Sequence, residues 1–113
     1  MSGKQVSAYA ITVTFEVDRV DLDTFLRLVL DNAAQSVRNE PECLRFDVLT
    51  PFGEDGPAEV FLYEIYTDRA AFDVHLASPH FKSFDASTLP IVRKKTVTAF
   101  EVVQNAKGLG GTA

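Results

Sequence analysis

The chain is poor in cysteine, with Cys43 alone among its 113 residues. A single thiol excludes an internal disulfide and a cysteine-rich metal site. No apolar run approaches the ~18 residues that a membrane span needs, and no apolar stretch typical of a secretory signal follows the first residues. We therefore expect a cytoplasmic protein that does not enter a membrane.

Basic residues are also scarce. Eleven Lys and Arg stand against 16 Asp and Glu, so the net charge is −5. No broad basic surface can be built from this composition, which argues against nucleic acid as a partner. The chain also lacks a glycine-rich dinucleotide fingerprint, and this absence favours a protein that needs no flavin or nicotinamide cofactor.

What the chain does contain predicts one folded domain. Hydrophobic residues make up 46% of it and nine residues are Phe, enough to form a core. Helical spacing extends from Asp21 or Asp23 to Glu40, a second helix follows a cap at Asp68, and a third is expected from Pro79 to about Leu89. Strand patterns cover residues 8–17, 43–50, 60–67 and 94–103.

This order, βαββαβ, predicts an α+β, ferredoxin-like fold: an antiparallel sheet with helices on one face only. We expect the domain to span residues 8–103, followed by a flexible tail at 104–113 with three glycines. The third and fourth strands are apolar on both faces, so the face without helices needs a cover. A homodimer that pairs sheet to sheet is the simplest one.

The two histidines of the chain, His75 and His80, flank a Ser-Pro break between two helices. Histidine is the side chain best suited to proton transfer near neutral pH. His75 is interpreted either as a core-edge residue bonded to a carbonyl or as a general base, and His80 either as a helix cap or as a substrate contact. Because two histidines alone are a poor metal site and no nearby carboxylate pattern completes one, we expect no metal.

The third strand carries tyrosine hydroxyl groups that can form a hydrogen bond with a ligand. Tyr63 and Tyr66 must face opposite sides of it, because their spacing is odd. If Phe61 and Tyr63 line the cavity beneath the helices, Glu64 points to the dimer face, where Arg45 is its expected partner.

Two further residues are candidates for the cavity wall. Asn32 lies near the apolar stripe of the first helix and points either into a cavity or along the helix flank. Phe72 shares a helix face with His75 and is expected in the core or the pocket wall.

Three stretches carry a resemblance to a known family. They are Glu-Pro-Glu-Cys-Leu-Arg-Phe-Asp-Val-Leu at 40–49, Tyr-Glu-Ile-Tyr-Thr-Asp at 63–68 and His-Leu-Ala-Ser-Pro-His-Phe-Lys at 75–82. With these motifs the chain resembles the antibiotic biosynthesis monooxygenase superfamily of small dimeric α+β barrels. The resemblance covers residues 8–103 and implies that His75 is a pocket residue.

Members of that superfamily include cofactor-independent quinol or polyketide monooxygenases, haem-degrading enzymes and an isomerase of the phosphorylated signal autoinducer-2. The haem-degrading branch relies on a tryptophan, and this chain has none. The chain is most similar to the quinol monooxygenases and the isomerase.

Three functions follow as hypotheses. The leading one is a cofactor-free monooxygenase in which His75 deprotonates a quinol that then reacts with oxygen. The alternative is an isomerase of a small phosphorylated dicarbonyl, for which Arg93 and Lys94, or else Lys95 or Lys82, would anchor the phosphate. The third is a dimeric module that binds a ligand without turnover.

Overall fold

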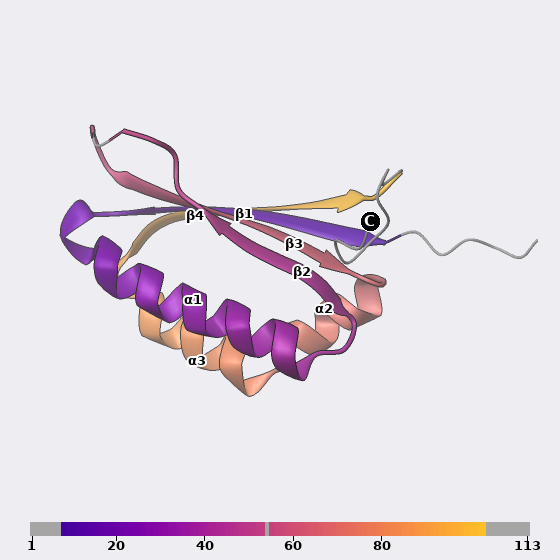
Figure 1. Ribbon diagram of the computed structural model, residues 1–113. Helices are drawn as coiled ribbons and strands as arrows, with labels where there is room; N and C mark the ends of the chain where they lie inside the picture. Colours follow the sequence, from indigo (N-terminus) through magenta and orange to yellow (C-terminus); the bar gives the residue numbers. More distant parts are fainter. Residues whose placement is uncertain (1–7, 54, 104–113) are drawn as a thin grey trace, which may run out of the picture.

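The computed structural model describes residues 8–53 and 55–103. The predicted tail at 104–113 and the start of the chain lie outside these residues. The fold is α+β, with a four-stranded sheet above a layer of helices (Figure 1). The expected order of elements is confirmed, with a 3-10 turn added before the first helix: β1 Tyr9–Val17, η1 Arg19–Asp21, α1 Leu22–Asn39, β2 Cys43–Leu49, β3 Ala58–Tyr66, α2 Arg69–Leu76, α3 Pro79–Thr88 and β4 Val92–Glu101.

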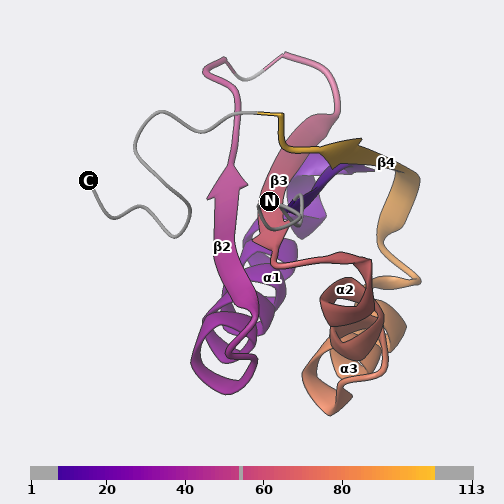
Figure 2. The ribbon, with the colours of Figure 1, turned by 90° about the vertical axis from the view of Figure 1, so that its right-hand side faces the viewer.

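The sheet has the strand order β2-β3-β1-β4, and all neighbours are antiparallel. β2 and β3 are consecutive in the chain and form a hairpin, and β4 is an edge strand beside β1. All the helices lie on one side of the sheet, as the ribbon turned by 90° also shows (Figure 2). Among the described residues, no helix is long and apolar enough to cross a membrane.

The main core forms where the inner face of the sheet meets α1 and α3. From Ile11 to Val17 every second residue of β1 is buried there, and β3 adds Val60 and Leu62. Burying a side chain of this size stabilises the fold by about 1.5–3 kcal/mol. The helices contribute Phe25 and Phe84, whose ring centroids lie 5.8 Å apart.

Local signals place the two histidines. Asp68 caps α2, accepting a hydrogen bond from the backbone N–H of Ala71 at 2.9 Å. Ser78 accepts from the N–H of Phe81 at 3.2 Å and donates to the carbonyl of His75 at 2.6 Å, while Pro79 takes the first position of α3. The break therefore sets His75 in the last turn of α2 and the next histidine in the first turn of α3.

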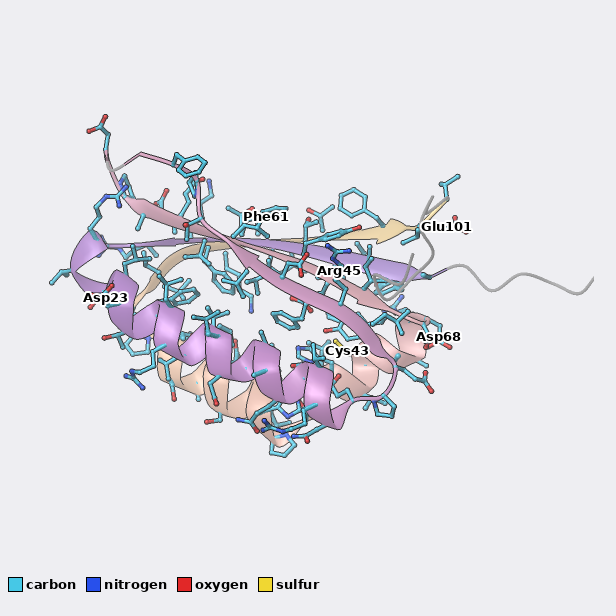
Figure 3. All side chains as sticks on the ribbon, in the orientation of Figure 1. Asp23, Cys43, Arg45, Phe61, Asp68 and Glu101 are labelled. Carbon is cyan, nitrogen blue, oxygen red and sulfur yellow. The ribbon has the colours of Figure 1, made fainter. Side chains whose placement is uncertain are left out.

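The outer face of the sheet is apolar and exposed. Phe61 is 36% exposed and Phe100 is 50% exposed, and Figure 3 shows Phe61 on the side away from the helices. The prediction that Phe61 and Tyr63 line the cavity is therefore wrong: Tyr63 packs on the outer face with Ala10 and Ile65. Since β3 is apolar on both sides, the alternation of its residues could not show which side faces the helices.

The expected pair of Glu64 and Arg45 is also wrong. Glu64 alternates with Tyr63 and so points inward, beneath the helices, where it is 3% exposed. Arg45 stays on the outer face, where it bonds Asp47 at 2.7 Å and lies 5.7 Å from the ring centroid of Tyr63. The strand thus delivers a carboxyl group to the interior.

Candidate active site

An apolar cavity of about 210 Å³ lies between the sheet and the helices. Its exposed wall residues are Val97 (50%) and Lys95 of β4 and Leu76 of α2 (38%), so it opens between the β4 edge and α2. Four polar side chains reach it, one from each of four elements, and the rest of the wall is apolar. These four are Asn32, Glu64, His75 and Lys95.

Behind the cavity wall, a buried carboxylate joins the two histidines. Glu40 Oε2 accepts hydrogen bonds from His75 Nδ1 at 2.9 Å and from His80 Nε2 at 2.5 Å. Glu40 is the C-cap residue of α1, just before Pro41, so its side chain links the end of α1 to α2 and α3. All three side chains are less than 10% exposed.

This geometry fixes the proton on His75. A carboxylate can only accept, so the imidazole hydrogen is on Nδ1 and Nε2 carries the free lone pair. Nε2 has no hydrogen-bond partner within residues 8–53 and 55–103, and His75 lines the cavity. The free lone pair is thus the one available to a molecule in the cavity.

The surroundings of His75 keep it neutral. Burial lowers its pKa, outweighing the raising effect of Glu40, and His80 lowers it further. Four aromatic rings have centroids 5.2–6.1 Å from the imidazole and shield it from solvent, which disfavours its charged form. They are Phe46, Tyr66, Phe72 and Phe81.

The carboxylate corrects one expectation about metals. Glu40, His75 and His80 offer three atoms within 4.8 Å of one another, a spacing that could hold an ion, whereas the sequence suggested no completing carboxylate. Ligands of one tetrahedral zinc are about 3.3 Å apart, given bonds of about 2.0–2.1 Å. The contacts of 2.5 and 2.9 Å are shorter and are those of hydrogen bonds.

Asn32 enters the cavity from α1 and is 2% exposed. Its Oδ1 is buried and has no partner among the described residues. A buried acceptor without a partner costs about 1–3 kcal/mol. A ligand that donates a hydrogen bond would satisfy it, which favours the cavity alternative for Asn32 over the helix-flank one.

Glu64 supplies a second titratable group. Burial raises its pKa to about 7, with Glu40 adding to the rise, while the hydrogen bond from Tyr66 and the charge of Lys95 oppose it. Tyr66 Oη donates to Glu64 Oε1 at 2.6 Å. The sequence did not predict that Glu64 lies in the cavity, because it did not show which face of β3 points inward.

One cation stands at the cavity mouth. Lys95 Nζ lies over the rings of Phe15 and Phe81, 5.6 and 5.7 Å from their centroids, and 3.5 Å from Asp85. Lys95 is one of the predicted phosphate anchors, whereas two others are elsewhere: Arg93 pairs with Asp18 at 2.8 Å on the surface, and Lys94 lies on the outer side of β4.

The remaining candidates are sorted by the same geometry. Phe72 lines the cavity as predicted, whereas His80 lies behind it, bonded to Glu40 instead of capping a helix. Cys43 is a packing residue, since burial raises the pKa of its thiol to about 12. The sequence signal for Glu40 was its position in the first family motif, where it was read only as the end of a helix.

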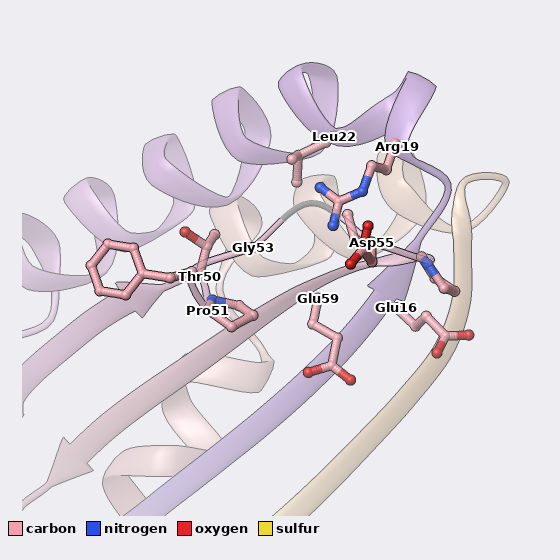
Figure 4. A pocket seen from close by; sticks show the side chains of 11 residues that line it. Glu16, Arg19, Leu22, Thr50, Pro51, Gly53, Asp55 and Glu59 are labelled. Atoms are coloured by element: carbon pink, nitrogen blue, oxygen red, sulfur yellow. The ribbon is translucent and has the colours of Figure 1, made fainter.

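A larger hollow of about 480 Å³ lies at the other end of the sheet, near η1 and the β2–β3 loop. Figure 4 shows Glu16, Asp55, Glu59 and Arg19 around it. The side chain of Arg19 is engaged by the carbonyl of Gly56 at 3.0 Å. Neither a histidine nor a cysteine lines this hollow, and its acidic groups are exposed (Asp55 and Glu59) or half-buried (Glu16). The smaller apolar cavity is therefore the candidate active site.

Comparison with known proteins identifies the family. The model of the antibiotic biosynthesis monooxygenase family matches residues 8–87. A protein of Mycobacterium tuberculosis, named as a candidate monooxygenase, is 34% identical over 80 residues, which are 71% of this chain and 75% of that protein. The chain therefore belongs to the antibiotic biosynthesis monooxygenase family, and the predicted resemblance is confirmed.

Solved structures agree on the fold. A candidate antibiotic biosynthesis monooxygenase from Nitrosomonas europaea has a TM-score of 0.79 and 23% identity, covering 90% of this chain and 96% of that one. Another from Caulobacter crescentus has a TM-score of 0.77 and 24% identity, covering 87% and 92%. At this identity the likeness concerns the fold alone.

Proposed function

We propose that the protein is a cofactor-independent monooxygenase that acts on a small quinol or a similar electron-rich aromatic. The observation that carries this proposal is His75, a neutral imidazole whose Nδ1 is held by Glu40 and whose other nitrogen is left for the cavity. The names of the family and of the relative from Mycobacterium tuberculosis support oxygen chemistry.

The reaction begins with proton transfer. His75 Nε2 removes the proton from a phenolic hydroxyl, and Glu40 stabilises the imidazolium that forms. Asn32 accepts a hydrogen bond from the second hydroxyl and orients the ring. The phenolate is electron-rich enough to reduce oxygen, so that a carbon–oxygen bond forms at the neighbouring ring carbon. Overall, the substrate supplies four electrons; one oxygen atom enters the product and the other leaves as water.

The cavity limits the size of the substrate. Its volume of about 210 Å³ is below the ~300 Å³ at which pockets for drug-sized ligands begin. A molecule of one ring or two fused rings is therefore the expected substrate class, and menadiol is a suitable probe.

The first test is oxygen uptake with menadiol and protein treated with a chelator, without added flavin, haem or metal. Spontaneous quinol oxidation is subtracted with a protein-free sample. We expect uptake proportional to protein concentration and unaffected by the chelator. Uptake that never exceeds the background with menadiol or related hydroquinones would contradict the proposal.

One observation favours a second candidate, the isomerase of a phosphorylated dicarbonyl: Lys95 at the cavity mouth could bind a phosphate. On this account Lys95→Ala raises the KM for a phosphorylated diketone about 10-fold or more, equivalent to ~1.4 kcal/mol of binding. Lys94→Ala is the matched control, since Lys94 is the neighbouring residue on the opposite face of β4. An unchanged KM in the Lys95 variant would remove this candidate.

We also propose that two copies pair through the outer face of the sheet. That face exposes Leu49, Phe61 and Phe100 by 36–50%, and dimerisation would bury them. We expect light scattering to give the mass of a dimer for the wild type and of a monomer for Phe61→Lys. The control is Leu30→Lys, which places the same charge at a 53% exposed position on α1. A monomeric wild type at micromolar concentration would contradict this assembly.

A further inference from the structure

Two titratable groups approach the cavity from its two layers. His75 comes from α2 in the helical layer, and Glu64 comes from β3 in the sheet. A flat aromatic molecule between the layers therefore has the base on one side and a carboxyl group on the other. The proposed deprotonation uses His75 alone and leaves Glu64 without a role.

The hydrogen bonding of Glu64 determines where its proton is. Tyr66 donates to Oε1 at 2.6 Å, so Oε1 is the accepting oxygen of the carboxyl group. Oε2 has no partner within the described residues, and Glu64 lines the cavity. When the group is neutral, its hydrogen is on Oε2 and is available to a bound molecule.

We propose that Glu64 is a second catalytic residue, which protonates the peroxide formed on the substrate and then removes the ring proton. This inference rests on the proposed monooxygenase function and deepens it. It also narrows the substrate class to quinols with an unsubstituted ring carbon beside a hydroxyl group, because the proton that Glu64 removes must come from that carbon.

The steps balance as follows. After His75 has taken the phenolic proton, oxygen bonds to the ring carbon and leaves a peroxide anion. Glu64 donates its proton to the outer oxygen and becomes a carboxylate. It then takes the hydrogen from the same ring carbon as the C=O bond forms and the O–O bond breaks. The departing hydroxide receives the proton held on His75 and leaves as water, so both residues return to their starting states.

The groups that face Glu64 support this role. Tyr66 holds Oε1, Glu40 and Cys43 lie on the side of α1 and β2, and Lys95 lies on β4. Burial is the largest cause of the raised pKa of Glu64, about 7, so a large fraction of the molecules carries the proton near neutral pH. A carboxyl group with this pKa can both donate and recover a proton during one turnover.

The test measures the ratio of hydroxylated naphthoquinone to menadione in single turnovers of menadiol with excess enzyme. The wild type is compared with Glu64→Gln. We expect Glu64→Gln to consume oxygen but to form hydroxylated naphthoquinone about 10²-fold more slowly, releasing menadione and hydrogen peroxide instead. Glu59→Gln, an exposed carboxyl group on the same strand, is the control and should keep the wild-type ratio. A wild-type ratio in Glu64→Gln would overturn the proposal.

A second variant separates catalysis from structure. Tyr66→Phe removes the hydrogen bond to Oε1 but keeps the carboxyl group, so it should retain most hydroxylated product. If Glu64 only holds Tyr66 in place, the two variants will behave alike, and the proposal fails.

The pH profile gives a further readout. In the wild type, the fraction of consumed oxygen that yields hydroxylated naphthoquinone should fall as the pH rises through about 7, because Glu64 then loses its proton. In Glu64→Gln this fraction should show no such fall. A pH-independent wild type would contradict the role of Glu64. A wild type without any oxygen uptake would instead overturn the proposed function together with this inference.

Discussion

Alanine at position 75 is expected to lower enzyme-dependent oxygen uptake with menadiol by about 10²–10⁴-fold, the usual contribution of a positioned general base. The substitution removes the lone pair that His75 presents to the cavity and leaves the apolar wall in place. The loss should appear in kcat more than in KM, since the base acts on the reacting proton. Stopped-flow absorbance of the phenolate should also show that the variant does not form the anion.

His80→Ala is the matched control for this prediction. Both histidines bond the same oxygen of Glu40, but only His75 lines the cavity. The His80 variant should therefore lose stability and keep most of its turnover. Equal losses of turnover in the two variants would indicate that the cluster is structural and that His75 is not the base.

Glu40→Ala is expected to reduce the free energy of unfolding by about 3 kcal/mol, because it leaves two buried imidazole N–H groups without an acceptor. Glu40 is the residue through which the end of α1 contacts both short helices. The measurement is urea unfolding at pH 7, with circular dichroism to confirm that the variant folds. Glu40→Gln, which keeps the shape and one acceptor, should be less destabilised while losing turnover.

Glu42→Ala serves as the comparison for Glu40. Glu42 is two residues away and accepts a hydrogen bond from Thr67 at the exposed surface. Its replacement should cost no more than about 0.5 kcal/mol, as is usual for surface positions. A Glu40→Ala variant as stable as Glu42→Ala would contradict the role given to the buried cluster.

Local signals in the sequence predicted most of the fold. The alternation that ends at Val17, the helix end at Glu40-Pro41, the cap at Asp68 and the Ser-Pro break at 78–79 each depend on a few neighbouring residues, so they could be recognised in the sequence directly. The sequence also placed the two histidines on either side of the Ser-Pro break, which is itself a local feature, and the structure joins both of them to Glu40.

The parts of the site that could not be predicted depend on long-range contacts. Glu40 is 35 residues from His75 and 40 from His80, so only the packing of α1 on α2 and α3 brings them together. Glu64 was assigned to the wrong face because β3 is apolar on both sides. Lys95 was one of several cations in a basic run, and only the register of β4 against β1 turns it toward the helices while Lys94 turns away.

The measurement that tests the central claim most directly is a single turnover of menadiol under ¹⁸O₂. The enzyme is treated with a chelator, and no cofactor is added. The account predicts one ¹⁸O atom in the hydroxylated naphthoquinone and the other in water. This label should be absent from the product of His75→Ala. Unlabelled quinone from the wild type, with all the ¹⁸O recovered as hydrogen peroxide, would show that the protein only dehydrogenates quinols and would contradict a monooxygenase.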